Sequence, residues 1–200
     1  MNRTGLVTAA LLGLSIPGLA VQESSQSSLE TLREYQLLAT SKTSTMEKEL
    51  NKAADGGYRF DGVMGGETGF GGKEVVAILS RARGAPAGKT YQYKLLAANK
   101  TSTMQKEMTE AASAGFEYRG QTVSDTTFGG REVIVIMERA RGSEQPRVEY
   151  RLLATNKTST MQKELSEAAA AGFLFRGVTV AKTTFGGNEV VVITERNVKP

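Results

Sequence analysis

Apolar and polar positions follow the same pattern three times along the chain. The three stretches cover residues 35–81, 93–139 and 150–196 and align with one another without gaps. They begin with YQLLATSKTSTMEKEL, YKLLAANKTSTMQKEM and YRLLATNKTSTMQKEL, and they end with EVVAILSR, EVIVIMER and EVVVITER. Self-similarity at a fixed spacing is typical of duplicated structural units. The sequence therefore predicts three copies of one small fold.

The order of elements within a copy follows from the spacing of its apolar residues. In the third copy, residues 150–155 form a short apolar run that predicts a strand. An apolar stripe at i, i+4, i+7 and i+8 then predicts one helix with charged residues opposite. The stripe consists of Met161, Leu165, Ala168 and Ala169. Two strands follow, the last over residues 189–196, so each copy has the order β-α-β-β.

The ends of each helix carry their own signals. In a capping box, a serine oxygen accepts a backbone N–H of the first turn, and a Glu or Gln three residues later reaches back. The pairs are Ser44 with Glu47, Ser102 with Gln105, and Ser159 with Gln162. Each helix is predicted to end at a glycine with left-handed backbone. These glycines are Gly57, Gly115 and Gly172.

Glycines also mark the two strands that follow the helix. The apolar parity changes around Gly177, which predicts a bulge or bend in that strand. Gly186 and Gly187 predict a two-residue hairpin turn between the last two strands.

The last strand of each copy is apolar on both faces. Its central residues are VVAI, VIVI and VVVI, whereas a strand with one wet face would alternate. One helix covers only one face, and so short a unit buries too little surface to be stable alone. We therefore predict an α+β protein of three tandem β-α-β-β repeats, each an antiparallel sheet with one helix, packed on one another through the sheets. A compact trio, or pairing with other chains, would satisfy this requirement.

The segments around the repeats divide the chain further. Residues 1–20 have one positive charge, a short apolar centre interrupted by Pro17 and a Gly-Leu-Ala end, which is typical of a cleaved secretory signal. A membrane anchor is the alternative, although the apolar run is short for a span. We expect a flexible lead-in over 21–33, repeats over 34–81, 91–139 and 149–196, linkers over 82–90 and 140–148, and a tail over 197–200. A secreted or periplasmic location follows from the signal.

Composition removes several classes of chemistry. The chain has no Cys and no His among its 200 residues, which excludes disulfides, thiolate nucleophiles, imidazole bases and most zinc sites. Lys and Arg number 25 against 21 Asp and Glu, and so small an excess does not predict nucleic-acid binding. We expect no catalytic residues, no metal and no cofactor, and no stable membrane insertion once the signal is cleaved.

The repeated pattern resembles that of a known family. Each copy reads Y-x-L-L, then L-x-x-A-A-x-x-G-[FY] or a close variant of it, then a closing strand that ends in Arg. This is similar to a family of short uncharacterised bacterial domains, in which a helix precedes a G-W-E-L-V-like strand. The chain departs from that family where Tyr58, Phe116 and Phe173 replace the tryptophan. The resemblance implies no activity, and a weaker likeness to dodecin-type proteins concerns topology alone.

The best candidate for a binding site is the Lys-Thr-Ser-Thr segment at each helix start. Free N–H groups, hydroxyls and an adjacent cation can hold an anion there. The candidate residues are Lys42, Ser44, Lys100, Ser102, Lys157 and Ser159. The same segment is also explained by helix capping alone. We therefore expect an exported, non-catalytic binding or assembly module of unknown partner, with self-association possible. The alternative is a small-ligand binder with anion sites at the helix starts or between repeats.

Overall fold

The computed structural model describes residues 32–67, 72–88, 90–125, 131–142, 147–182 and 188–198. The first unit contains β1 (Arg33–Thr40), α2 (Thr43–Asp55), β2 (Arg59–Glu67) and β3 (Lys73–Ala82). The second contains β4 (Tyr91–Ala98), α3 (Thr101–Ser113), β5 (Glu117–Asp125) and β6 (Arg131–Ala140). The third contains β7 (Val148–Thr155), α4 (Thr158–Ala170), β8 (Leu174–Lys182) and β9 (Asn188–Asn197). The predicted signal and the Gly186-Gly187 turn lie outside the described residues.

Each unit has one antiparallel sheet, in which the last strand lies in the middle. The strand orders are β1-β3-β2, β4-β6-β5 and β7-β9-β8, so the first strand of each unit is an edge strand. The pairing register shifts between Phe175 and Gly177 in β8, and at the equivalent places in β2 and β5. The predicted bulge is therefore confirmed, and it occurs in all three units.

The helix ends agree with the sequence, but the helix starts do not. Gly57 has a φ of 83°, and the next residue, Tyr58, donates its N–H to the carbonyl of Ala53 at 3.1 Å. The other two units repeat this C-terminal arrangement. The predicted capping box is wrong, because Lys42 occupies the N-cap and no side chain caps the helix. Ser44 lies one residue inside the helix, where its oxygen no longer faces the first-turn N–H groups.

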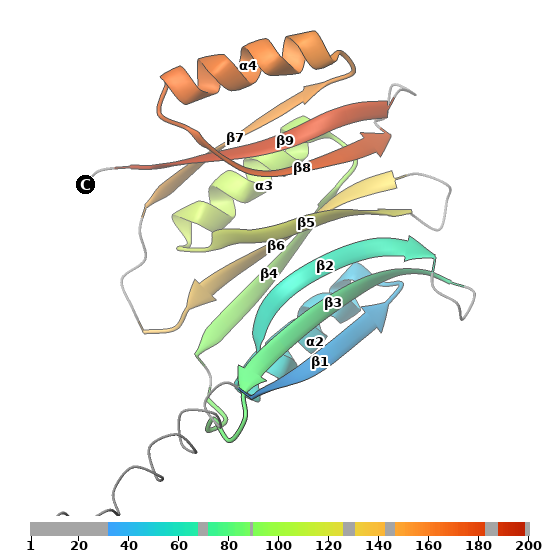
Figure 1. The fold of residues 1–200 in the computed structure, drawn as a ribbon, viewed down its shortest axis with the longest axis vertical. Helices are drawn as coiled ribbons and strands as arrows, with labels where there is room; N and C mark the ends of the chain where they lie inside the picture. The colour runs from blue at the N-terminus through green and yellow to red at the C-terminus, as the bar shows by residue number, and fades with distance from the viewer. Residues whose placement is uncertain are drawn as a thin grey trace, which may run out of the picture.

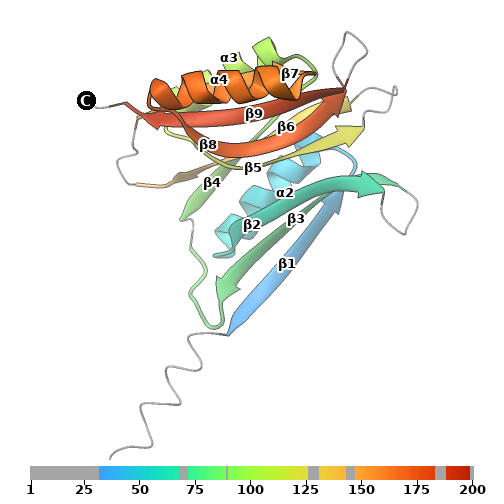
Figure 2. The same cartoon turned by 45° about the horizontal axis from the view of Figure 1, so that its top comes forward.

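The units form a stack in which helices alternate with sheets (Figures 1 and 2). Helix α2 lies between its own sheet and the outer face of the second sheet, and one core joins all three. Residues of α2 such as Leu50 pack there against Ile134 and Ile136 of β6. Helix α3 lies in the same way between the second and third sheets. The stack therefore begins with the bare face of the first sheet and ends with α4.

This arrangement explains the strands that are apolar on both faces. In β6, Val135 faces α3 while Ile136 faces α2, and neither is exposed to solvent. Strand β9 is buried on both faces in the same manner. In β3 the outward Ile78 is 43% exposed, because no helix of the described residues covers this face of the first sheet. The units thus pack through the second faces of their sheets, as predicted, and the cover comes from the preceding unit's helix.

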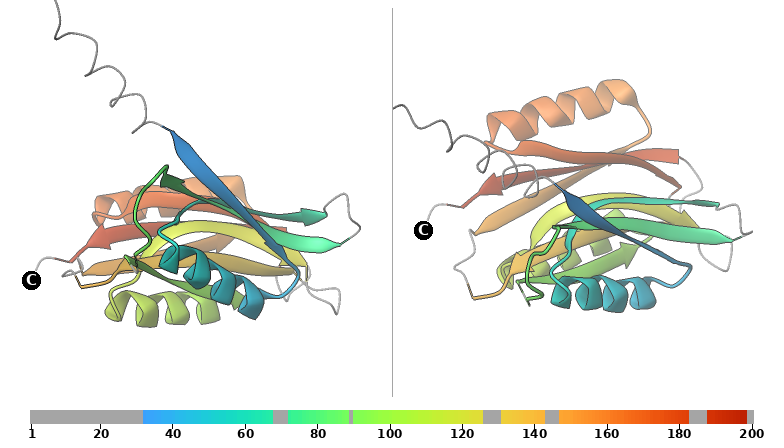
Figure 3. Two further views of the ribbon diagram at one scale, coloured as in Figure 1. Left: turned by 90° about the horizontal axis from the view of Figure 1, so that it is seen from below. Right: turned by 60° about the horizontal axis from the view of Figure 1, so that its bottom comes forward.

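A second contact joins neighbouring units along their bulged strands. Strand β2 lies beside β5, and β5 lies beside β8 (Figure 3). The backbone N–H of Gly65 in β2 donates to the hydroxyl of Thr122 in β5 at 2.7 Å. The extensive contacts between units join the first to the second and the second to the third, so the trio is an open stack. In the described part of the chain, no helix has the length and hydrophobicity that a membrane span requires.

Candidate functional site

The junctions between units bring polar side chains to the edge strand of the following unit. At the first junction, the N–H of Leu95 donates to Oε2 of Glu47 at 2.9 Å. Asn51 donates from Nδ2 to the carbonyl of Tyr93 at 2.9 Å, and its Oδ1 accepts the Tyr93 N–H at 3.0 Å. Side chains of α2 therefore satisfy the backbone groups that an edge strand leaves unpaired. Glu47 does this instead of closing the predicted capping box.

The second junction repeats this contact with a different residue. Gln105 of α3 donates from Nε2 to the carbonyl of Tyr150 at 2.8 Å. Its Oε1 accepts the N–H of Leu152 at 2.8 Å. One amide side chain thus makes two of the three bonds that Glu47 and Asn51 make at the first junction. The equivalent residue in α4 is Gln162, which is exposed because no further unit packs on α4 in the described part of the chain.

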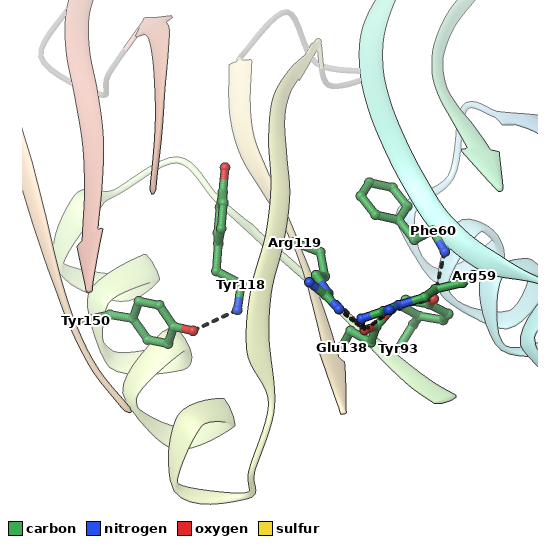
Figure 4. Close-up of polar contacts among 7 residues, drawn as sticks. All are labelled: Arg59, Phe60, Tyr93, Tyr118, Arg119, Glu138 and Tyr150. Carbon is green, nitrogen blue, oxygen red and sulfur yellow. Dashed lines mark hydrogen bonds and ion pairs between the residues drawn. The ribbon is translucent and has the colours of Figure 1, made fainter. Parts of the chain in front are cut away.

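A buried tyrosine hydroxyl ties each junction together (Figure 4). Tyr93 lies in β4 and is 2% exposed. Its hydroxyl accepts the N–H of Phe60 from the preceding unit at 2.8 Å and donates to Oε2 of Glu138 at 2.7 Å. Tyr150, 3% exposed, accepts the N–H of Tyr118 in the same way at 2.7 Å. The N–H groups that they accept come from the bulges of β2 and β5.

Glu138 is the most enclosed charge of the first junction. Its Oε1 accepts hydrogen bonds from Nη2 of Arg59 in the preceding unit at 2.9 Å and from Nε of Arg119 in its own unit at 2.8 Å (Figure 4). Burial raises the pKa of Glu138, and the bonds from Tyr93 and Arg59 offset part of this rise. Arg59 also stacks on the ring of Tyr91, 4.6 Å from its centre. These contacts join the two units by charge as well as by packing.

The second junction carries a different set of charges. Glu195, the counterpart of Glu138, is paired with Arg176 of its own unit at 2.6 Å. The residue facing it from the preceding unit is Glu117, where the first junction has Arg59. Burial, and then the charge of Glu195, raise the pKa of Glu117. The charge of Glu195 therefore opposes ionisation of Glu117 at the second junction, whereas the first junction has the ion pair of Arg59 with Glu138.

The chemistry available to these groups is limited. Burial raises the pKa values of both Tyr93 and Tyr150 well above the ordinary tyrosine range, and raises the pKa of Tyr118 to about 12. The first two therefore stay protonated at neutral pH, so they donate hydrogen bonds and are poor bases. The Tyr93 hydroxyl donates one hydrogen bond and accepts one. Tyr93, Tyr150 and Glu138 therefore stabilise the contacts between units.

A hollow of about 200 Å³ lies between the first and second units. Its polar lining includes Asp125, which is paired with Lys73 at 3.1 Å and with Arg131 at 2.9 Å. Hydrogen bonds from these two cations lower the pKa of Asp125. Both cations thus already hold a carboxylate. Over the described ranges, no three acidic side chains gather where they could hold a metal ion.

The six candidate anion-binding residues lie at the three helix starts, one pair in each unit. They are the exposed side chains of Lys42, Ser44, Lys100, Ser102, Lys157 and Ser159. The lysine is the N-cap of each helix, and the serine is the second helical residue. None of these side chains bonds to another described residue, so the anion sites stay a prediction.

The two ends of the stack expose apolar side chains that are buried at the junctions. The head surface is the outer face of the first sheet, and it consists of Tyr35, Leu37, Met64 and Ile78. The tail surface consists of the half-buried Leu165 and the exposed Ala169 on α4, and of the exposed Phe175, Val178 and Val180 on β8. Tyr35 is 68% exposed, although its counterparts Tyr93 and Tyr150 are buried. Sequence periodicity could not reveal these surfaces, because the residues that form them match buried ones in the other copies.

Comparison with protein-family models, with curated proteins and with solved structures gave no match to this chain. The resemblance to a family of short bacterial domains therefore stays a prediction.

Proposed function

We propose that the chain is an exported, non-catalytic assembly module that binds a macromolecular partner through its end surfaces. The observation that carries this proposal is the exposure of apolar side chains at both ends of the stack. Four of them, in three different strands, share one sheet face at the head. Contiguous apolar patches on a folded protein mark sites of interaction.

The terminal units support a binding role because they are not capped. A repeat protein that ends in water needs terminal repeats with a polar outer face. Here the first unit keeps Tyr35 and Leu37 at positions that are covered in the next unit, and the third unit keeps Phe175. Export is supported by the signal pattern of residues 1–20.

Site-specific photo-crosslinking in the producing cell tests this proposal. A crosslinking amino acid replaces Leu37 at the head or Phe175 at the tail, and the control position is Val198, an exposed apolar residue on neither surface. We expect discrete crosslinked products from positions 37 and 175 and none from 198. Equal or absent crosslinking at all three positions would overturn the assembly role.

Anion binding at the helix starts is the second candidate. It gains support from the absence of a side-chain cap on all three described helices, because the first-turn N–H groups are then not used by a serine. Calorimetry with inorganic phosphate tests it on the full chain. Binding that is lost when Lys42, Lys100 and Lys157 are replaced by Gln would support this candidate, and unchanged heats would end it.

A further inference from the structure

We propose that the partner is a second copy of this chain, which binds head to tail. The tail surface of one copy packs on the head surface of the next and continues the stack. This inference rests on the proposed assembly role and names its partner. Both surfaces belong to one chain, and the structure already shows twice how such surfaces fit together.

The hydrogen bonds between helix and edge strand at the second junction can form again between two copies, because the tail carries the same type of residue. There Gln105 bonds the carbonyl of Tyr150 and the N–H of Leu152. The equivalent helix residue at the tail is again a glutamine, Gln162, whose side chain contacts, among the described residues, only the Ser166 hydroxyl at 3.5 Å. Because β1 is an edge strand, the outward backbone groups of Tyr35 could bond Gln162 of another copy in the same way.

An aromatic ring and a glycine fit together at each junction. The ring of Phe60 lies over Gly120, where an added Cβ would be 3.2 Å from it. The Tyr118 hydroxyl lies over Gly177, and an added Cβ there would collide with it. At the ends of the stack, the tail has the ring without a glycine opposite it, and the head has the glycine without a ring. Phe175 at the tail is 57% exposed, and Gly62 at the head has nothing within 4 Å of an added Cβ.

The charges at the two ends have changed together. Position 138 carries a glutamate at the first junction, and Arg59 meets it from the preceding unit. The corresponding pair across a tail-to-head junction is Leu174 with Ser80, and both are neutral. Loss of the carboxylate at the head thus accompanies loss of the charged partner at the tail. This pair would bury no charge of its own, whereas the Arg33 guanidinium, which bonds the Ser80 hydroxyl at 2.6 Å, would lie beside the contact.

The contact is heterologous, because two different surfaces of the same chain meet. Repetition of one such contact produces a ring if the rotation closes and an open filament if it does not. Assembly is therefore not limited to two copies, and the size of the assemblies should increase with protein concentration.

Sedimentation of purified full-length protein tests the inference with two blocked variants. Leu37→Glu blocks the head, and Phe175→Glu blocks the tail; both side chains are exposed, so each variant should fold. Val198→Glu is the matched control. We expect the wild type and the control to form species larger than a monomer, and each blocked variant to be monomeric. An equimolar mixture of the two blocked variants should give a dimer and nothing larger, because only one intact pair of surfaces remains.

The outcomes separate this inference from the function on which it rests. A wild type that stays monomeric up to about 1 mM, a concentration at which even weak complexes form, would overturn self-assembly. If crosslinks to another protein persist in cells, the assembly role survives with a different partner. A blocked variant that still dimerises alone would show an isologous contact, which contradicts the head-to-tail arrangement.

Discussion

Removal of a single hydroxyl should separate the role of a junction tyrosine from that of an exposed one. Tyr93→Phe deletes the oxygen that accepts the Phe60 N–H and donates to Glu138. A buried donor left without a partner costs about 1–3 kcal/mol, and a bond to a charged group contributes about 1.5–3 kcal/mol. Glu138 keeps its two arginine partners, so the lower end applies to the second loss. We expect the free energy of unfolding to fall by about 2.5–4.5 kcal/mol.

The matched control is Tyr35→Phe, at the same position of the first unit. Tyr35 is exposed and its hydroxyl bonds to no other described residue, so the change should stay within about 0.5 kcal/mol. Urea unfolding followed by circular dichroism measures both variants, at a concentration low enough to keep the chain monomeric. If Tyr93→Phe unfolds within about 0.5 kcal/mol of the wild type, the tyrosine does not hold the junction.

Four further substitutions test the second junction and the head. Gln121→Val should raise the free energy of unfolding in urea by about 1 kcal/mol, because Nε2 is buried without a partner among the described residues; a loss would contradict this. Gly177→Ala should lower the melting temperature because its Cβ has no room, whereas Gly62→Ala should leave the monomer unchanged; equal effects would refute the ring-on-glycine contact. Glu117→Gln should raise the melting temperature at pH 7. Folding raises the pKa of Glu117, so the ionised carboxylate lowers the stability of the folded state at a pH above that pKa. The gain should vanish below about pH 4, where the carboxyl is protonated in both the folded and the unfolded state. Exposed Glu67→Gln is the control, and a gain that persists in acid would contradict the mechanism.

Local features of the unit were predictable because each depends on neighbouring residues. The left-handed glycine at the end of each helix and the bulge before Gly177 follow from short sequence windows, and both are present. The two apolar faces of β6 also predicted cover from another unit, and the structure shows it. These features could be inferred because packing leaves its period in the sequence.

The helix starts show why the rest could not be predicted. Glu47 has the spacing of a capping box, yet its carboxylate bonds the N–H of Leu95 in the next unit. The two residues are 48 positions apart, and no local pattern distinguishes a bond within a helix from one across a junction. The end surfaces escaped notice for a related reason. Tyr35 matches Tyr93 in sequence, and only the position of its unit in the stack makes it exposed.

Burial of one sheet face by the preceding unit is the central claim, and cysteine labelling tests it most directly. The chain has no cysteine, so single replacements of Ile78, Ile136 and Ile193 place one thiol at the same position of each unit. Alkylation rates are measured at a concentration where the chain is monomeric. Ile136 and Ile193 are fully buried and Ile78 is not, so we expect fast labelling at position 78 and labelling at least about 100-fold slower at the other two. Equal rates at all three positions would show that the units do not cover one another.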